Sequence, residues 1–353
     1  MGSPAYAEGV GDKQWHLRFL DISHAHEISR GKGVTVAVID TGVSNHRDLE
    51  GNLLDGTDLV SSGKSGHTDI DGHGTAMAGL IAAHGSASNG ALGIAPEAKI
   101  LPIRLMKSSP SDFIAGPAID YAVKHGAKVI NMSIGGELSP ETIDAVNRAQ
   151  RADVVLVASA GNHPEDTTVT SPALLPPVLA VGAVDQSGHK SAISVSGPEL
   201  DIMAPGENMA STFKNGAYSV KGRGTSDAAA IVSGAAALLR SAFPSMTAEE
   251  VVERLERTAT DEGRPGRDDE YGYGVVNIVA ALSGGKLATS SSPSGSAPTL
   301  GTPTTAPTQT VRAAPEAQST NNSTPLIVGA VIVILVAGLG GIVWARRRST
   351  NAQ

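Results

Sequence analysis

Short runs of apolar, largely β-branched residues recur between residues 34 and 184 and are separated by segments with the composition of helices. A run without polar alternation is typical of a strand that is buried on both faces of a parallel sheet. Regular alternation of such strands with helices predicts β-α units. The sequence therefore predicts an α/β fold with a mostly parallel central sheet and helices on both faces. The strands are expected at Val34–Ile39, Ile100–Leu105, Val129–Met132, Val154–Ala158 and Val178–Val184, with helices that include Phe113–His125 and Pro140–Ala149.

Three polar residues, far apart in the chain, stand where predicted elements begin or end. Asp40 follows the first strand, in the segment Val-Ile-Asp-Thr-Gly. His73, in Asp-Gly-His-Gly-Thr, and Ser226, in Gly-Thr-Ser, each precede a small, apolar stretch that indicates a buried helix. Open α/β sheets place their sites at the carboxyl ends of strands. Asp, His and Ser, in this chain order, are also the components of a nucleophilic triad.

Each of these residue types suits one role in hydrolysis. A serine hydroxyl needs a neighbouring base to take its proton, and a helix N-terminus favours the negative charge that develops beside it. Histidine accepts and returns a proton near neutral pH, and a carboxylate fixes its tautomer. Taken singly, all three residues have ordinary interpretations as turn or cap residues. Their combination favours Ser226 as nucleophile, His73 as base and acid, and Asp40 as orienting carboxylate.

These motifs together resemble those of the subtilisin-like serine peptidases, the subtilase family, over about Gly33–Leu282. The resemblance implies that Asn162, in Ala-Ser-Ala-Gly-Asn, is an oxyanion donor beside the backbone N–H of the serine. It also implies that an extended substrate pairs with the main chain of Ser133, Ile134 and Gly135, like an added strand. Without the family context, Asn162 would be a turn residue and the second segment an ordinary strand end.

A narrower resemblance is to the mycosin-type subgroup, which is linked to type VII secretion in actinobacteria. It rests on the start of the domain at Trp15–Leu17, on its end at Tyr271–Asn277 and on the C-terminal tail. This resemblance implies components of a secretion system as partners, in addition to protein or peptide substrates.

The residue after the expected nucleophile departs from the family pattern, which has Met-Ala where this chain has Asp227-Ala228. A carboxylate that faced the site would oppose the developing oxyanion and favour a charged His73. A carboxylate that turned outward would cap the helix N-terminus, where an acid is stabilising. We expect the outward orientation and keep the other as the alternative.

No cofactor and no metal ion are predicted. The chain has no cysteine, which excludes a Cys-His metal site and gives no information on the redox compartment. Asp69, Asp71 and His73 alternate along the chain as metal ligands do on a strand, but His73 is better explained as the base. Many subtilases bind calcium through a loop whose counterpart here, Ser86–Leu92, contains no acid, so we expect no calcium there.

The composition changes abruptly after Gly284. About 40 residues rich in Ser, Thr, Pro, Ala and Gly follow, and they predict an extended, disordered linker. The next segment has 20 residues without a charge, the length of a membrane-spanning helix, and is followed by three arginines. The predicted order is a residual leader at 1–12, a peptidase domain at 13–283, the linker at 284–325, a transmembrane helix at 326–345 and a basic cytoplasmic tail at 346–353.

The arginines also predict topology, because basic flanks remain on the cytoplasmic side of a membrane. We expect a single-pass protein of the cell membrane with a cytoplasmic C-terminus and an extracellular catalytic domain. Ala5-Tyr6-Ala7 resembles the end of a signal-peptide cleavage site but has no apolar segment before it, so we expect a leader that is lost or lies upstream. The net charge of −8, with a basic tail, makes the globular part acidic and argues against nucleic-acid binding.

Two functions from different classes remain open. The first is a membrane-anchored serine endopeptidase that hydrolyses peptide bonds through an acyl-enzyme intermediate. The second is a catalytically weak scaffold of the envelope or of a secretion system, in which the fold is kept for binding. The complete set of Asp40, His73, Asn162 and Ser226 favours the enzyme. A lipase or esterase fits less well, because the Gly-x-Ser-x-Gly elbow is absent at Ser226.

Overall fold

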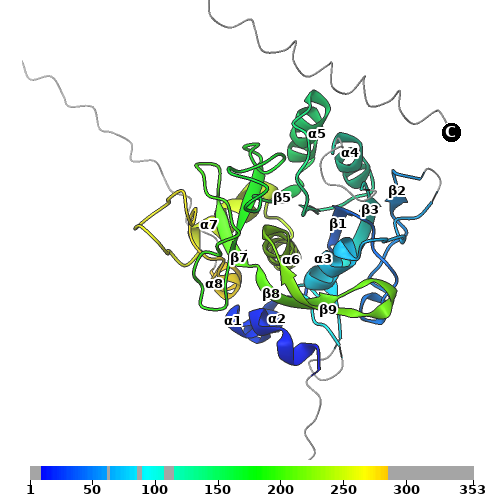
Figure 1. The fold of residues 1–353 in the computed structure, drawn as a ribbon, viewed down its shortest axis with the longest axis horizontal. Coiled ribbons are helices and arrows are strands. Elements are labelled where there is room, and N and C mark those ends of the chain that lie inside the picture. Colours follow the sequence, from blue (N-terminus) through cyan, green and yellow to red (C-terminus); the bar gives the residue numbers. More distant parts are fainter. Residues whose placement is uncertain (1–8, 62–63, 86–89, 107–114, 285–353) are drawn as a thin grey trace, which may run out of the picture. The chain divides into compact units, whose positions relative to one another are not determined.

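A computed structural model describes residues 9–61, 64–85, 90–106 and 115–284. Its central feature is a seven-stranded sheet with the order β2-β3-β1-β4-β5-β6-β7 (Figure 1). Every neighbouring pair of strands in this sheet runs parallel, which confirms the predicted α/β fold class. The strands are β1 (Thr35–Asp40), β2 (Thr57–Asp58), β3 (Lys99–Arg104), β4 (Val129–Met132), β5 (Val155–Ser159), β6 (Val178–Val184) and β7 (Ile202–Pro205), with a separate antiparallel pair, β8 (Glu207–Thr212) and β9 (Tyr218–Arg223).

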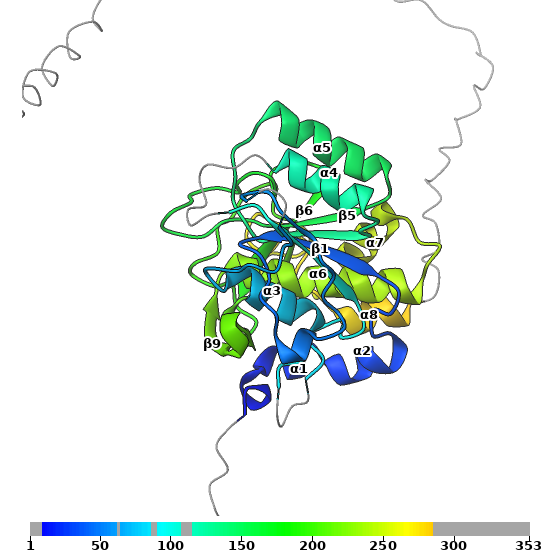
Figure 2. The same cartoon turned by 90° about the vertical axis from the view of Figure 1, so that its right-hand side faces the viewer.

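Helices cover both faces of the sheet, as Figure 2 shows. Two of them, α4 (Gly116–Lys124) and α5 (Pro140–Arg151), lie on one face, and α3 (His73–Ala82) and α6 (Thr225–Ala242) lie on the other. The remaining helices pack into the same core as α6. They are α1 (Trp15–Phe19), α2 (Ile22–Ile28), α7 (Ala248–Arg257) and α8 (Ile278–Ser283).

The side chains of β1 alternate between the two cores. Val36 and Val38 pack on the side of α3 and α6, whereas Ala37 and Ile39 pack on the side of α4 and α5. All four are fully buried. Successive strand residues point to opposite faces, so a strand covered by helices on both sides has to be apolar throughout. This explains why β1 is an uninterrupted apolar run rather than an alternating one.

The helix α6 runs through the core. All but three of its 18 residues are buried, and most of them are Ala or other small residues. Small residues allow close packing: a Cβ on Gly234 would lie 2.6 Å from the Cβ of Ile94. A helix that is apolar on every side is typical of a protein interior. The core therefore fixes the first turn of α6, which carries Ser226.

The carboxyl ends of three adjacent strands bring polar residues to one edge of the sheet. The strand β1 ends at Asp40, β4 is followed by Ser133, and β5 leads into the turn that contains Asn162. The first turns of α3 and α6 bring His73 and Ser226 to the same edge, where they contact Asp40 and Ser133. Sites of open α/β sheets lie at this edge.

The predicted elements agree with the observed ones within a few residues, and β4 and β6 agree at both ends. The sequence did not identify β7, the pair of β8 and β9, or the helices α7 and α8. The predicted linker at 284–325, apart from its first residue, the transmembrane helix at 326–345 and the tail at 346–353 lie outside the described residues. Among the described residues, no helix is both long enough and apolar enough to cross a membrane.

Candidate active site

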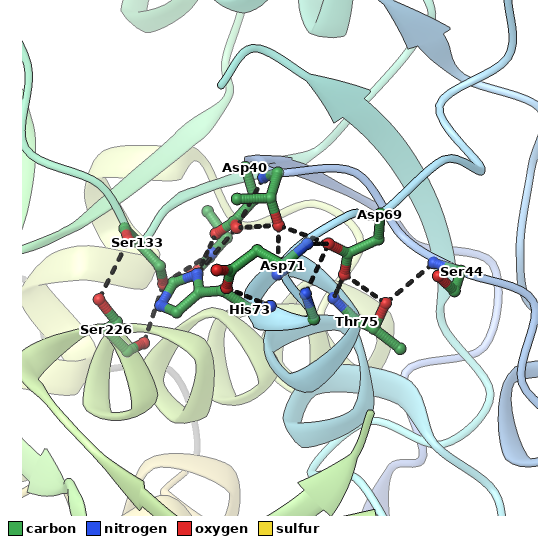
Figure 3. Close-up of polar contacts among 12 residues, drawn as sticks. Asp40, Ser44, Asp69, Asp71, His73, Thr75, Ser133 and Ser226 are labelled. Atoms are coloured by element: carbon green, nitrogen blue, oxygen red, sulfur yellow. Dashed lines mark hydrogen bonds and ion pairs between the residues drawn. The ribbon is translucent and has the colours of Figure 1, made fainter. Parts of the chain in front are cut away.

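Asp40 and His73 form an ion pair between the end of β1 and the start of α3 (Figure 3). His73 Nδ1 lies 2.8 Å from Asp40 Oδ1 and 3.0 Å from Oδ2. Asp40 is fully buried, and the N–H of Thr41 donates to Oδ1 at 2.7 Å. A buried carboxylate at this distance holds a proton on Nδ1, which leaves Nε2 to accept a second one. The pair therefore has the arrangement that a histidine base requires.

Three carboxylates determine the charge of His73. Burial lowers the pKa of His73, but Asp40, by charge and hydrogen bond, and Asp227 and Asp71, by charge, outweigh burial and raise the pKa to about 9. His73 is therefore largely protonated at neutral pH. Since only the neutral imidazole can accept a proton, the capacity of His73 to act as a base increases as the pH rises.

The loop before α3 is held by the buried side chain of Asp69. Asp69 Oδ1 accepts the N–H of Gly72 at 2.7 Å and the hydroxyl of Thr41 at 2.9 Å. Asp69 Oδ2 accepts both the N–H and the hydroxyl of Thr75, at 2.9 and 2.6 Å. The N-cap of α3 is Gly72, which has no side chain, so Asp69 replaces the usual capping group for the first turn. Asp69 thereby fixes the start of the helix that carries His73.

Ser226 faces the carboxyl end of β4 from the first turn of α6. Its hydroxyl donates to the carbonyl of Ser133 at 3.0 Å, and the Ser133 hydroxyl donates to the carbonyl of Ser226 at 2.8 Å. Figure 3 shows the His73 imidazole between Asp40 and Ser226. No hydrogen bond between Ser226 and His73 is present in the described part of the chain. The Ser226 hydroxyl therefore has to leave the Ser133 carbonyl before His73 can take its proton.

Asn162 lies in the turn after β5 and is fixed at both its backbone and its side chain. Its Oδ1 accepts the N–H of Thr225 at 2.9 Å, and its own N–H donates to Asp166 Oδ2 at 2.8 Å. Because Oδ1 accepts the N–H of Thr225, the Nδ2 group of the same amide points away from Thr225. Within the described residues, Asn162 Nδ2 has no partner, so it is available to an incoming acceptor.

Ser133, Ile134 and Gly135 follow β4 as an irregular segment beside Ser226. Ile134 is buried and anchors the segment, whereas Gly135 is half-buried. A Cβ on Gly135 would meet only one described atom within 4 Å, Thr170 Oγ1 at 3.7 Å. The space beside Gly135 is therefore open, as an approaching peptide backbone would require.

Asp227 does not turn outward, so the expected outward orientation is wrong. Its exposed fraction is 5%, and the N-cap residue of α6 is Gly224, which has no side chain. Burial raises the pKa of Asp227 to about 7, against the charge of His73, which lowers it. The carboxylate lies inside, against Gly222 of β9, and its negative charge raises the pKa of His73.

With this geometry established, comparison with known proteins identifies the fold family. Residues 31–274 match the model of the subtilase family of peptidases. The chain belongs to the subtilase family. It is 40% identical over 271 residues to the thermostable alkaline protease of Halalkalibacterium halodurans, covering 76% of this chain and 73% of that one. It is 39% identical to subtilisin DY of Bacillus licheniformis over 259 residues, covering 71% of this chain and 92% of that one.

Solved structures of mycosins resemble this subtilase as well. The structure of MycP1 from Mycobacterium smegmatis has a TM-score of 0.70 and 31% identity, and the match covers 80% of this chain and 87% of that one. The MycP3 protease of the type VII (ESX-3) secretion system gives a TM-score of 0.69 and 35% identity over 79% of this chain and 90% of that one. The expected resemblance to the mycosin-type subgroup is confirmed, and the relatives identify this subtilase as a serine endopeptidase.

Asp69 and His73, which the sequence suggests as possible metal ligands, form other interactions in this subtilase. The two oxygens of Asp69 accept hydrogen bonds from five donors, and His73 is bound to Asp40. Among the described residues, no group of three or more acidic or histidine side chains is arranged to hold a metal ion. The prediction that the loop at 86–92 binds no calcium remains a prediction, since residues 86–89 lie outside the described residues.

Two acidic residues that hold the backbone of the site were not predicted from the sequence. The sequence suggests Asp69 only as a metal ligand, and it gives no signal for Asp166, which accepts the backbone N–H of Asn162. A signal for Asp69 exists in the sequence: α3 begins after Gly72, which cannot cap it, so an acid shortly before that glycine is a candidate for the missing acceptor.

Proposed function

We propose that this subtilase is a membrane-anchored serine endopeptidase in which Ser226 attacks the peptide carbonyl, His73 transfers the proton and Asp40 orients His73. One observation carries the proposal. His73 Nδ1 makes two short contacts to the buried Asp40 carboxylate, at the edge of the sheet to which α6 brings Ser226. The chemistry of an activated serine requires this arrangement of base and orienting acid.

In the proposed first step, the Ser226 hydroxyl turns from Ser133 towards His73 Nε2, gives up its proton and attacks the substrate carbonyl. Asn162 Nδ2 and the N–H of Ser226, which has no partner within the first turn of α6, stabilise the charge on the carbonyl oxygen. His73 then protonates the leaving amine, and an acyl-enzyme remains on Ser226. A water molecule, deprotonated by His73, hydrolyses the ester and restores the serine.

The substrate in this proposal is an extended peptide that pairs with the main chain of Ser133, Ile134 and Gly135. Backbone pairing depends little on the side chains of the peptide, which suits an enzyme that acts on proteins. The open space beside Gly135 supports such an approach. The reaction needs no cofactor, and we propose none.

The anchor is proposed from the sequence: 326–345 has the length and composition of a membrane-spanning helix, and Arg346–Arg348 follow it. The catalytic domain would then lie outside the cell membrane and the C-terminus in the cytoplasm. MycP1 and MycP3, the solved neighbours, belong to type VII secretion systems. We include components of such a system among the partners of this subtilase.

The catalytic part is tested by hydrolysis of a fluorogenic peptide library by the full chain in detergent. The Ser226→Ala variant is expected to lose hydrolysis by about 10⁶-fold, in line with loss of a catalytic serine. Ser241→Ala is the matched control, because Ser241 lies on the same helix and donates only to the carbonyl of Lys32. Folded wild-type protein that is no more active than Ser226→Ala would favour the scaffold function.

The topology is tested by labelling intact cells with a membrane-impermeant maleimide. The chain has no cysteine, so single substitutions report one position each. The Ser23→Cys variant, at an exposed position of α2, is expected to react in intact cells. The Ser349→Cys variant is expected to react only after permeabilisation. Reaction of both in intact cells, or of neither, would contradict the proposed topology.

A further inference from the structure

A cluster of lysines lies at the edge of the sheet opposite the active site. The strand β1 ends at Asp40 and begins at Thr35, so Thr35 marks the opposite edge. Lys99, the first residue of β3, pairs with Thr35, and the N–H of Lys128, just before β4, donates to the Thr35 carbonyl at 2.9 Å. We define this surface, the basic edge, by four residues that lie on it: Lys32, Lys99, Lys124 and Lys128.

Two members of the basic edge reach it through short connections. Lys32 lies in the turn before β1, and Lys124 is the last residue of α4, the helix that leads into β4. Lys32, Lys124 and Lys128 are exposed, and in the described part of the chain no lysine forms an ion pair. Lys99 donates to two neutral oxygens, so its charge is not compensated either. A cation is favoured at the end of a helix, but this accounts for Lys124 alone.

Two acidic side chains beside the basic edge are bound by arginines. Arg30 Nε lies 2.7 Å from Glu97 Oε1, next to the start of β3. Arg240 Nη2 lies 2.8 Å from Asp153 Oδ2, next to the start of β5. Neither carboxylate forms an ion pair with a lysine of the described chain, so the lysine charges of the basic edge remain available to a partner.

An open hollow of about 700 Å³ lies on the basic edge. Its lining includes Arg30, Lys32 and Lys99, and its one acidic residue is Glu97. The hollow therefore carries three cations against one carboxylate. The chain as a whole has a net charge of −8, so a hollow of positive charge differs from the rest of the protein. Charge of this sign favours a ligand with anionic groups such as phosphates.

The described domain also ends on the side of the basic edge. The helix α6 crosses the core from the active site to this edge, where the Ser241 hydroxyl donates to the carbonyl of Lys32 at 2.8 Å. The guanidinium of Arg254 lies 4.8 Å from the ring of Phe243, at the end of α6, and its Nε donates to the carbonyl of Ala281 on α8. The helix α8 packs against both α2 and α6 (Figure 2). The last described residue follows α8, so the chain leaves the domain beside the basic edge.

We propose that the basic edge is a membrane-facing surface, which binds the phosphate groups of anionic lipids and turns the active site away from the bilayer. The inference rests on the proposed function, because it requires the membrane anchor. An anchor holds the domain at a high effective concentration beside the lipid, so a weak electrostatic contact is sufficient. Each basic residue near an anionic surface strengthens binding by about fivefold. A lipid surface fits better than an acidic protein, because the chain continues to the proposed anchor from the same side of the domain.

The first test measures the orientation of the domain on lipid, with the full chain in nanodiscs. The chain has no cysteine, so one substitution places one fluorophore. Gln150→Cys labels the last turn of α5, before β5, and Thr68→Cys labels the opposite edge, where the Thr68 carbonyl lies beside Gly42. Both positions are exposed. Energy transfer to a lipid-linked acceptor is then compared between the two positions.

In nanodiscs that contain phosphatidylglycerol, transfer from Gln150→Cys is expected to exceed transfer from Thr68→Cys, because the basic edge lies on the lipid. In phosphatidylcholine alone the difference is expected to disappear, since no anionic headgroup is present. It is also expected to disappear at about 0.5 M salt, where the Debye length falls to a few ångströms. The salt comparison needs no substitution in the basic edge.

The second test reverses charges on the basic edge. Lys32→Glu combined with Lys128→Glu is expected to weaken docking on phosphatidylglycerol by at least about 25-fold, from about fivefold for each lysine. Lys13→Glu combined with Lys221→Glu is the matched control, because it changes the net charge equally on exposed residues beside β8 and on β9. The control is expected to retain the difference in energy transfer.

Flotation of the full chain with phosphatidylcholine vesicles at about 0.5 M salt reports the anchor separately, because electrostatic binding is screened there. A chain that floats, but whose energy transfer responds neither to phosphatidylglycerol nor to the paired reversal of Lys32 and Lys128, would overturn the inference alone. A chain that does not float, but binds phosphatidylglycerol vesicles at low salt through the same lysines, would overturn the proposed anchor and leave the lipid-binding surface intact.

Discussion

The support of α3 by Asp69 gives the most quantitative prediction. Asp69→Ala removes the acceptor of five hydrogen bonds in one step. Two of the donors have another acceptor. The Thr41 hydroxyl also donates to Asp40 Oδ1 at 3.2 Å, and the N–H of the exposed Asp71 can bind water. The remaining three, the N–H of Gly72 and the N–H and hydroxyl of Thr75, are buried and lose their acceptor.

The magnitude follows from these three donors. A buried donor without an acceptor costs about 1–3 kcal/mol, and the space left by the carboxylate admits water that offsets part of this. We therefore expect Asp69→Ala to lower the free energy of unfolding by about 3–5 kcal/mol. The same substitution loosens the start of α3, so kcat is expected to fall more than KM rises, since His73 loses its orientation.

The stability is measured by urea unfolding in the Ser226→Ala background, which prevents self-digestion. Asp71→Ala is the matched control, because Asp71 lies two residues away, is exposed and accepts one hydrogen bond, from the N–H of His73 at 3.2 Å. It is expected to cost less than about 1 kcal/mol. An Asp69→Ala variant as stable as Asp71→Ala would refute the account of how α3 is held.

Asn162→Ala removes an oxyanion donor and should lower kcat by about 10²–10³ with little change in KM, measured with a chromogenic peptide; an unchanged kcat would exclude the amide from the reaction. Hydrolysis by the wild type should rise with pH through about 9, where His73 loses its proton, and a plateau reached below pH 7 would contradict this. Burial, and to a lesser extent Arg18, lower the pKa of His16 to about 3, and neither ring nitrogen has a partner in the described structure. Unfolded His16 binds a proton near pH 6.5, so stability should be lost as the pH falls from about 6.5 towards 3. In the His16→Leu variant, the melting temperature should fall less over that pH range. A fall as large as that of the wild type would rule out His16 as the cause.

The parallel sheet could be predicted because its strands carry a strong local signal. The run Val178–Val184 is buried throughout and coincides with β6 at both ends. The strand β9 gave no such signal, since none of Tyr218–Arg223 is buried and the strand contains Lys221 and Arg223. A strand on the surface with polar residues on both faces has no apolar periodicity to detect.

The residues of the site also differ in whether the sequence predicts their roles. Asp40, His73 and Ser226 could be proposed because their residue types and chain order carry chemical meaning. The role of Asp69 could not, because most of its partners are backbone N–H groups that no sequence displays. The inward orientation of Asp227 could not be predicted either. It depends on the space beside Gly222 in β9, and the sequence does not show how that strand lies against α6.

The central claim is that Ser226 is a nucleophile activated by His73 and Asp40. It is tested most directly by reaction of the folded full chain with a peptidyl phosphonate, followed by mass spectrometry of the labelled peptide. We predict a single adduct on Ser226, and labelling that is at least 10³-fold slower in His73→Ala and Asp40→Asn protein, in line with the loss of a triad partner. An adduct on another residue, or labelling of Ser226 at the same rate without His73, would contradict the account.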